Sequence, residues 1–120
     1  MILLGSTYPL GLIRRPAHVE PASLDELRRR ARAEGFLSFW GHGNTRAAAG
    51  EVLGLDPAPA TERPALRLTT DHLPSLDGHV FDEVWVLSPD YVPGFRPRIG
   101  EEVGLESISG WQVLRIRFHS

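Results

Sequence analysis

Apolar and polar residues alternate along this chain in blocks that predict both strands and helices. Five blocks have the length and composition of strands: residues 2–4, 36–40, 66–69, 84–87 and 113–118. The block at 84–87 is continuously apolar, which is typical of a strand that is buried on both faces, whereas the block at 66–69 alternates and predicts a half-exposed strand.

Two further blocks have helical character. Ser23 and Glu26 form a capping box at the start of the first, its apolar residues recur at helical spacing, and Gly35 is placed to end it. The second runs from Thr45 to Leu53 and is rich in alanine, with Gly54 as its predicted C-cap. Both helices are therefore predicted with defined ends.

The order of elements is strand, helix, strand, helix and then three strands. It predicts a single α/β domain over residues 1–120, with a mixed sheet of about five strands and two main helices. Residues 88–100 hold three prolines and two glycines, so we expect a long loop there that could act as a functional lid.

Composition narrows the classes of function. The net charge of -2 provides no overall attraction for long duplex nucleic acid. The apolar start of the chain breaks at Gly5, too early for a signal peptide or a membrane span, so we expect a cytoplasmic protein that does not bind membranes. No cysteine is present, which excludes a thiolate metal site. All 13 basic residues are arginines, and a guanidinium can grip two phosphate oxygens at once.

The segment from Gly41 to Thr45 carries the most specific chemistry. It joins a predicted strand to a predicted helix, so the first amides of that helix point outward together with the positive end of its dipole, as in many anion sites. Gly41 and Gly43 let the backbone approach a phosphate closely, and Asn44 or Thr45 can cap the helix or bond the ligand. No lysine is present, which excludes a P-loop.

His42 would lie beside the bound phosphate. A histidine can protonate the alkoxide that leaves when a 2′-hydroxyl attacks an RNA phosphodiester, and that reaction needs no metal. A histidine after a strand is more often structural than catalytic, but a glycine on each side of His42 favours the catalytic role. The sequence therefore predicts a metal-independent phosphodiesterase with no cofactor.

Other polar and aromatic groups have simpler explanations. Arginines 28, 29, 30 and 32 could contact nucleic acid, but cations near a helix C-terminus are more often a solvated face. Acidic residues and histidines between 71 and 83 lack any fixed metal-ligand spacing, so a polar loop is the better interpretation. Tyr8, Trp40, Trp85 and Trp111 could stack on bases, but isolated aromatics in strands usually belong to the core.

These motifs together resemble the viral anti-CRISPR ring nucleases of type III systems. The resemblance is carried by Ile2 to Ile13, by residues 36–45 (Phe-Leu-Ser-Phe-Trp-Gly-His-Gly-Asn-Thr) and by Leu53-Gly54. That family begins with a strand and a serine- or asparagine-bearing loop, and has a Gly-His-x-x-Thr turn before a helix ending near Leu-Gly. The resemblance covers roughly the first half of the chain.

The resemblance implies a homodimer that binds cyclic tetra-adenylate across its two-fold axis and cuts it without metal, which switches off a second messenger in the host cytoplasm if the protein is viral. It assigns the catalytic role to His42. It assigns ligand binding to the loop of Gly5, Ser6 and Thr7 and to Arg63.

The second half of the chain departs from the family pattern. The family has an arginine-leucine pair, an acidic residue, a glycine and a short helix where this chain has residues 88–98, so Arg96 and Arg98 are the candidates for that arginine. The alternative hypothesis is a non-catalytic dimer that binds a nucleotide or another protein through the same surface.

Overall fold

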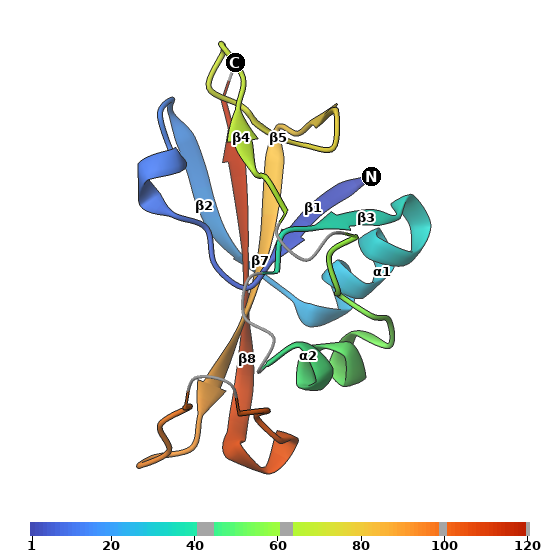
Figure 1. Cartoon of the computed structure of the whole chain (residues 1–120), viewed down its shortest axis with the longest axis vertical. Helices are drawn as coiled ribbons and strands as arrows, with labels where there is room; N and C mark the ends of the chain where they lie inside the picture. Colours follow the sequence, from blue (N-terminus) through green and yellow to red (C-terminus); the bar gives the residue numbers. More distant parts are fainter. Residues whose placement is uncertain (41–44, 61–63, 99–100, 120) are drawn as a thin grey trace.

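The predicted five-stranded mixed sheet forms the middle layer of the protein (Figure 1). The computed structural model describes residues 1–40, 45–60, 64–98 and 101–119. The strands of this sheet are β1 (Ile2–Gly5), β2 (Ala17–Ala22), β3 (Phe36–Ser38), β7 (Glu83–Tyr91) and β8 (Ile108–Phe118). Their order across the sheet is β2-β8-β7-β1-β3.

Three of these strands are parallel. Leu4 of β1 lies opposite Ser38 of β3, and Gly5 of β1 lies opposite Val86 of β7. Strand β8 runs antiparallel to both β7 and β2. The carboxyl ends of β1 and β3 therefore lie next to each other, and the edge discussed below is the one formed by these strand ends, not a lateral edge strand. Strand β7 runs in the same direction and extends beyond these ends.

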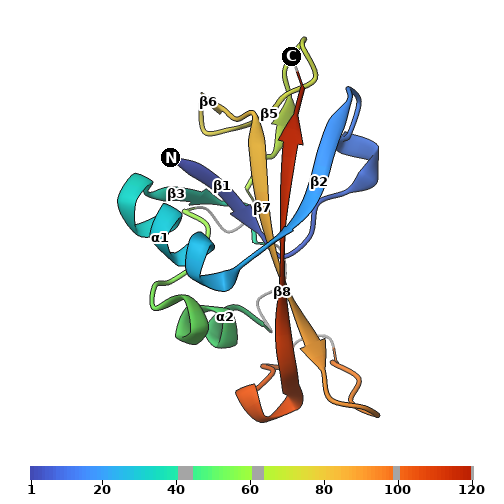
Figure 2. The same ribbon diagram turned by 180° about the vertical axis from the view of Figure 1, so that it is seen from behind.

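Both predicted helices form on one face of the sheet (Figure 2). Helix α1 spans Leu24–Glu34, and the Ser23 hydroxyl accepts the Glu26 amide at 3.0 Å, as the capping box predicts. Helix α2 spans Arg46–Leu53. Gly35 and Gly54 end the two helices with φ of 71° and 70°, a conformation that glycine adopts without steric cost.

The core under the helices is assembled from alternate residues of the strands. Leu27 and Ala31 of α1 and Ala49 and Leu53 of α2 are buried against the sheet. The sheet contributes Ile2, Leu4, Trp85, Leu87 and Val113 to the same cluster. Because successive strand residues point to opposite faces, the residues between them belong to a second core.

A small three-stranded antiparallel sheet helps to cover the second face. It consists of β4 (Arg67–Leu68), β5 (Pro74–Leu76) and β6 (His79–Val80). Leu76 and Phe81 are buried against Leu3, Val84, Val86, Ile116 and Phe118 of the main sheet. Residues 66–69 were expected as a strand, and they provide β4 of this separate sheet.

Strand β2 was not predicted. Its sequence Ala-His-Val-Glu-Pro-Ala lacks an apolar run, and Pro21 disfavours a central strand. Because β2 lies at the edge of the sheet, it needs a partner on one side only, and β8 provides that partner over six residues.

The expectation of a loop over residues 88–100 is wrong for its first part. Residues 88–91 continue β7 and pair with β8 over residues 108–112, forming what we call the β7–β8 arm (Figure 1). Beyond Val86 the strand β1 no longer flanks β7, and proline is tolerated in such an edge position, which is why Pro89 does not end the strand. The arm extends past α2 along the 41 Å long axis of the molecule (Figure 1).

Candidate functional site

The edge where β1 and β3 end brings together segments that are far apart in sequence. The Leu4 carbonyl accepts the Phe39 amide at 3.0 Å, which extends the β1–β3 pairing past the end of β3. On the other side of β1, the Ser88 hydroxyl donates to the Ser6 carbonyl at 3.3 Å. Ligands of open α/β sheets bind outside the carboxyl ends of parallel strands, so this edge is the candidate site.

Gly5 is required at this edge because an aromatic ring lies directly on it. A Cβ atom at Gly5 would lie 2.4 Å from two carbons of the Phe39 ring. Tyr8 packs edge-on against the same ring, with 6.1 Å between ring centroids. Burial raises the pKa of Tyr8 to about 12, and its hydroxyl donates to the Leu12 carbonyl at 3.3 Å. Gly5 and Tyr8 therefore hold the intervening Ser6 and Thr7 beside the end of β3.

Ser38 fixes the chain at the end of β3. Its buried hydroxyl donates to the Pro57 carbonyl at 2.6 Å and accepts the Trp40 amide at 3.1 Å. Pro57 follows α2 in the sequence, so one hydroxyl ties the segment before α2 to the segment after it. No pattern in the sequence indicates this role, because a single serine at the end of a strand has many common explanations.

The two helices differ at their N-termini. Helix α1 has the Ser23 cap and both Asp25 and Glu26 in its first turn, so its positive end is matched within the chain. Thr45, the N-cap residue of α2, is buried and makes no side-chain capping bond, and no acidic residue lies in the first turn of α2. Among the described residues, no capping or acidic side chain neutralises the start of α2, so its amides can stabilise an anion.

The C-terminal end of α2 is held by α1. The Arg28 Nε donates to the Val52 carbonyl at 2.6 Å, where a cation also matches the negative end of the helix dipole. Arg28 in turn pairs with Asp25 at 2.8 Å. Of the four clustered arginines, Arg28 therefore helps to position α2.

A charged network anchors α1 to the sheet. Glu83 accepts hydrogen bonds from Arg30 at 2.7 Å, from Arg115 at 2.8 and 3.0 Å, and from the Trp85 indole at 2.9 Å. Both guanidinium groups also lie over the Trp85 ring, at 5.5 and 5.2 Å from its centroid. Arg30 also bonds Glu34.

These contacts shift the pKa of Glu83. Burial raises that pKa, but the hydrogen bonds from Trp85 and Arg115 and the positive charges of Arg115 and Arg30 outweigh it, so the pKa lies below its ordinary value. The hydrogen bond from Arg30 likewise lowers the pKa of Glu34. The network thus keeps both carboxylates ionised and ties Glu83 of β7 to Arg30 of α1.

The structure brings together only part of the predicted site. Ser6 is buried and Thr7 exposed beside the end of β3, and the buried Thr45 begins α2. The remaining residues of the turn, Gly41, His42, Gly43 and Asn44, lie outside the described residues, as does Arg63.

Arg96 and Arg98 lie apart from this edge within one copy of the chain. They follow the end of the β7–β8 arm, where both are exposed and Arg98 makes a 4.0 Å ion pair with Glu101. The last residue of β7 is five residues beyond Val86, the last partner of β1, which corresponds to about 17 Å of extended strand.

The aromatic residues behave as the sequence suggested. Trp40 and Trp85 are buried in the core under the helices, and Trp111 packs partly against it. The acidic and histidine residues between 71 and 83 lie partly in turns, with positive φ at His72 and Asp77. Within the described ranges, no three such side chains gather as possible metal ligands.

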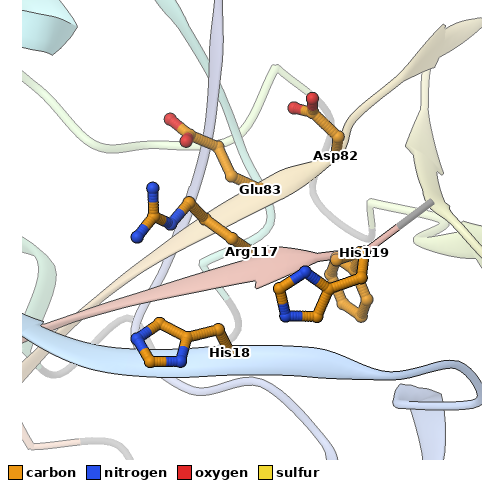
Figure 3. A pocket seen from close by; sticks show the side chains of 6 residues that line it. His18, Asp82, Glu83, Arg117 and His119 are labelled. Carbon is orange, nitrogen blue, oxygen red and sulfur yellow. The ribbon is translucent and has the colours of Figure 1, made fainter.

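A pocket of about 310 Å³ lies at the opposite end of the sheet. Figure 3 shows its side chains coming from three neighbouring strands, with His18 on β2, Arg117 on β8 and Glu83 on β7. The Glu20 carboxylate already pairs with Arg117 at 2.8 Å and lies 3.4 Å from His18. Because His18, Glu83 and Arg117 already have partners within the chain, we do not assign this pocket a ligand.

No helix in the described part of the chain is long and apolar enough to cross a membrane.

Comparison with known proteins identifies a similar fold in a virus protein. No protein-family model matches the chain, and no curated protein matches its sequence. Among solved structures, the chain is similar to B116 of Sulfolobus turreted icosahedral virus, with a TM-score of 0.58 and 11% identity over 98% of both chains. The likeness covers the whole domain, and at this level of identity it establishes the fold alone.

Proposed function

We propose that this protein is a metal-independent phosphodiesterase that degrades cyclic oligoadenylate, with cyclic tetra-adenylate as the first substrate to test. The observation that carries the proposal is the pairing of β1 with β3, which continues to Phe39 and puts the Ser6–Thr7 loop beside the end of β3. The uncapped start of α2 adds a place where a phosphate would be stabilised.

The chemistry is an internal transesterification. The 2′-hydroxyl of one adenosine attacks the neighbouring phosphorus, a new 2′-oxygen–phosphorus bond forms, and the bond from phosphorus to the 5′-oxygen breaks. His42 gives its proton to the leaving 5′-oxygen, while the 2′-hydroxyl proton passes to solvent. The products are linear oligoadenylates with a 2′,3′-cyclic phosphate and a 5′-hydroxyl end.

The remaining groups bind and orient the ring. Amides from Gly43 to Thr45 and the Arg63 guanidinium would stabilise charge on the phosphoryl oxygens, and Ser6 or Thr7 would hold the ribose in line for attack. A homodimer would present two such sites to one cyclic ligand. This arrangement would remove a second messenger and so silence type III CRISPR signalling.

The test is direct. The purified protein is incubated with labelled cyclic oligoadenylates of several ring sizes, with and without a chelator, and the products are identified. We expect cleavage of one ring size that chelation does not slow. Tight retention of an intact ring would instead indicate a non-catalytic nucleotide-binding protein. The absence of both cleavage and thermal stabilisation would indicate an interaction protein, because a ligand that binds the native state raises its apparent stability.

A further inference from the structure

Trp40 carries a buried hydrogen-bond donor that has no partner in the described part of the fold. The residue is 3% exposed, and its indole Nε1 has no acceptor among the residues that the structure describes. Its backbone is fixed by the bond from the Trp40 amide to Ser38 Oγ. The indole ring is packed in the cluster under the helices with Ala49, Leu53 and Leu87, none of which has a polar side-chain atom.

An unpaired indole N–H is costly in such a place. Removing a donor from water without giving it an acceptor loses the free energy of its hydrogen bond to water, and buried tryptophans usually find a partner for this group. The contrast within this chain is clear, because the buried Trp85 donates to Glu83 at 2.9 Å. No side chain of the cluster around Trp40 could supply an acceptor by changing its rotamer.

The position of Trp40 in the chain points to the acceptor. Trp40 directly follows the pairing of Phe39 with Leu4 and precedes the buried Thr45 that begins α2. Its backbone therefore lies at the same edge of the sheet as Ser6, and α2 begins six residues later in the sequence, with no side-chain capping bond from Thr45. A phosphate oxygen is the strongest acceptor that the proposed ligand would bring to this edge.

We propose that the indole N–H of Trp40 donates a hydrogen bond to a phosphodiester oxygen of the bound oligoadenylate, which makes Trp40 a further substrate-binding residue. This inference rests on the proposed function. Because Nε1 is buried in the free protein, ligand binding must be accompanied by a local rearrangement that opens the ring edge toward the ligand.

Binding is measured with cyclic tetra-adenylate whose 2′-hydroxyls are replaced by fluorine, so that no variant can cleave it. Trp40→Phe keeps an aromatic ring but removes the donor, and Trp111→Phe is the matched control in the same cluster. We expect Trp40→Phe to weaken binding by about tenfold or more, the scale of a lost bond to a charged group, and Trp111→Phe to leave it unchanged. Calorimetric titration measures both.

The indole N–H resonances of the unaltered protein distinguish a direct bond from altered packing. We expect the Trp40 N–H proton to move downfield when the ligand saturates the protein, and the Trp85 proton to stay in place because its acceptor is already Glu83. This measurement decides the matter even if Trp40→Phe fails to fold.

The outcomes separate the two proposals. If the unaltered protein binds the ring but the Trp40 resonance does not move, or Trp40→Phe binds equally well, the role of Trp40 is overturned and the proposed function stands. If the unaltered protein binds no cyclic oligoadenylate of any ring size, both are overturned.

Discussion

Gly5 illustrates how single residues shape the edge that we assign to the ligand. The sequence places Gly5 in a loop that the family resemblance assigns to ligand binding, whereas the contact that requires a glycine is with Phe39 of the same chain. Ser38 likewise takes its importance from Pro57 and Trp40. Such roles depend on contacts between distant segments, which no local pattern in the sequence encodes.

The close contact at Gly5 predicts a large effect of one methyl group. Gly5→Ala would place its Cβ 2.4 Å from the Phe39 ring, so we expect the free energy of unfolding to fall by about 1–3 kcal/mol, measured by urea unfolding. Gly11→Ala is the matched control, because a Cβ there meets nothing within 4 Å. Adding Phe39→Leu should recover part of the loss, and an additive double variant would refute the steric explanation.

At the scale of elements, patterns with a strong local signal predicted the structure well. The capping box fixed the start of α1, and two glycines marked the ends of both helices, because these signals act within one turn of backbone. Strand β2 and the extension of β7 over residues 88–91 were missed. Each contains a proline and is held by pairing with β8, which lies about 20 to 100 residues further along the chain, and sequence propensity does not report such pairing.

The attachment of α1 to the sheet predicts a dependence of stability on pH. The pKa of Glu83 is lower in the folded protein than in the unfolded chain, so its contribution is complete above the unfolded value of about 4.3 and is lost as the pH falls through the folded value. We expect Glu83→Gln to lower the free energy of unfolding at pH 7 by about 1–3 kcal/mol and to flatten its acid dependence, measured by urea unfolding between pH 7 and 3.

Glu51→Gln provides the control for this measurement. Glu51 is exposed on α2 and has no ion-pair partner among the side chains described. Its substitution should leave both the stability at pH 7 and the acid dependence as in the unaltered protein. An acid dependence of Glu83→Gln as steep as that of the unaltered protein would show that other carboxylates carry it.

At the scale of the whole molecule, the α/β domain with a five-stranded mixed sheet and two helices was predicted correctly. The similarity to a virus protein over 98% of both chains agrees with that fold. The site residues stay a prediction, because Gly41 to Asn44 and Arg63 lie outside the described residues and Arg96 and Arg98 follow the end of β7. In the homodimer that we propose, the arm of one copy would carry these arginines toward the site of the other copy.

This geometry makes the oligomeric state a test of the proposal. We expect light scattering coupled to size exclusion to give twice the chain mass of 13.3 kDa. In the dimer, Arg96→Ala and Arg98→Ala together should weaken ligand binding without lowering the melting temperature, since both side chains are exposed. A monomer at all concentrations would remove the two-fold site from the proposed function.

The central claim is that His42 protonates the leaving group, and one rate measurement tests it most directly. Single-turnover cleavage of cyclic tetra-adenylate is compared between the unaltered protein and His42→Ala, with enzyme in excess and chelator present. We predict that the rate falls about 10²–10⁴-fold in the variant while the ring is still bound. Cleavage by His42→Ala at the rate of the unaltered protein would contradict the mechanism proposed here.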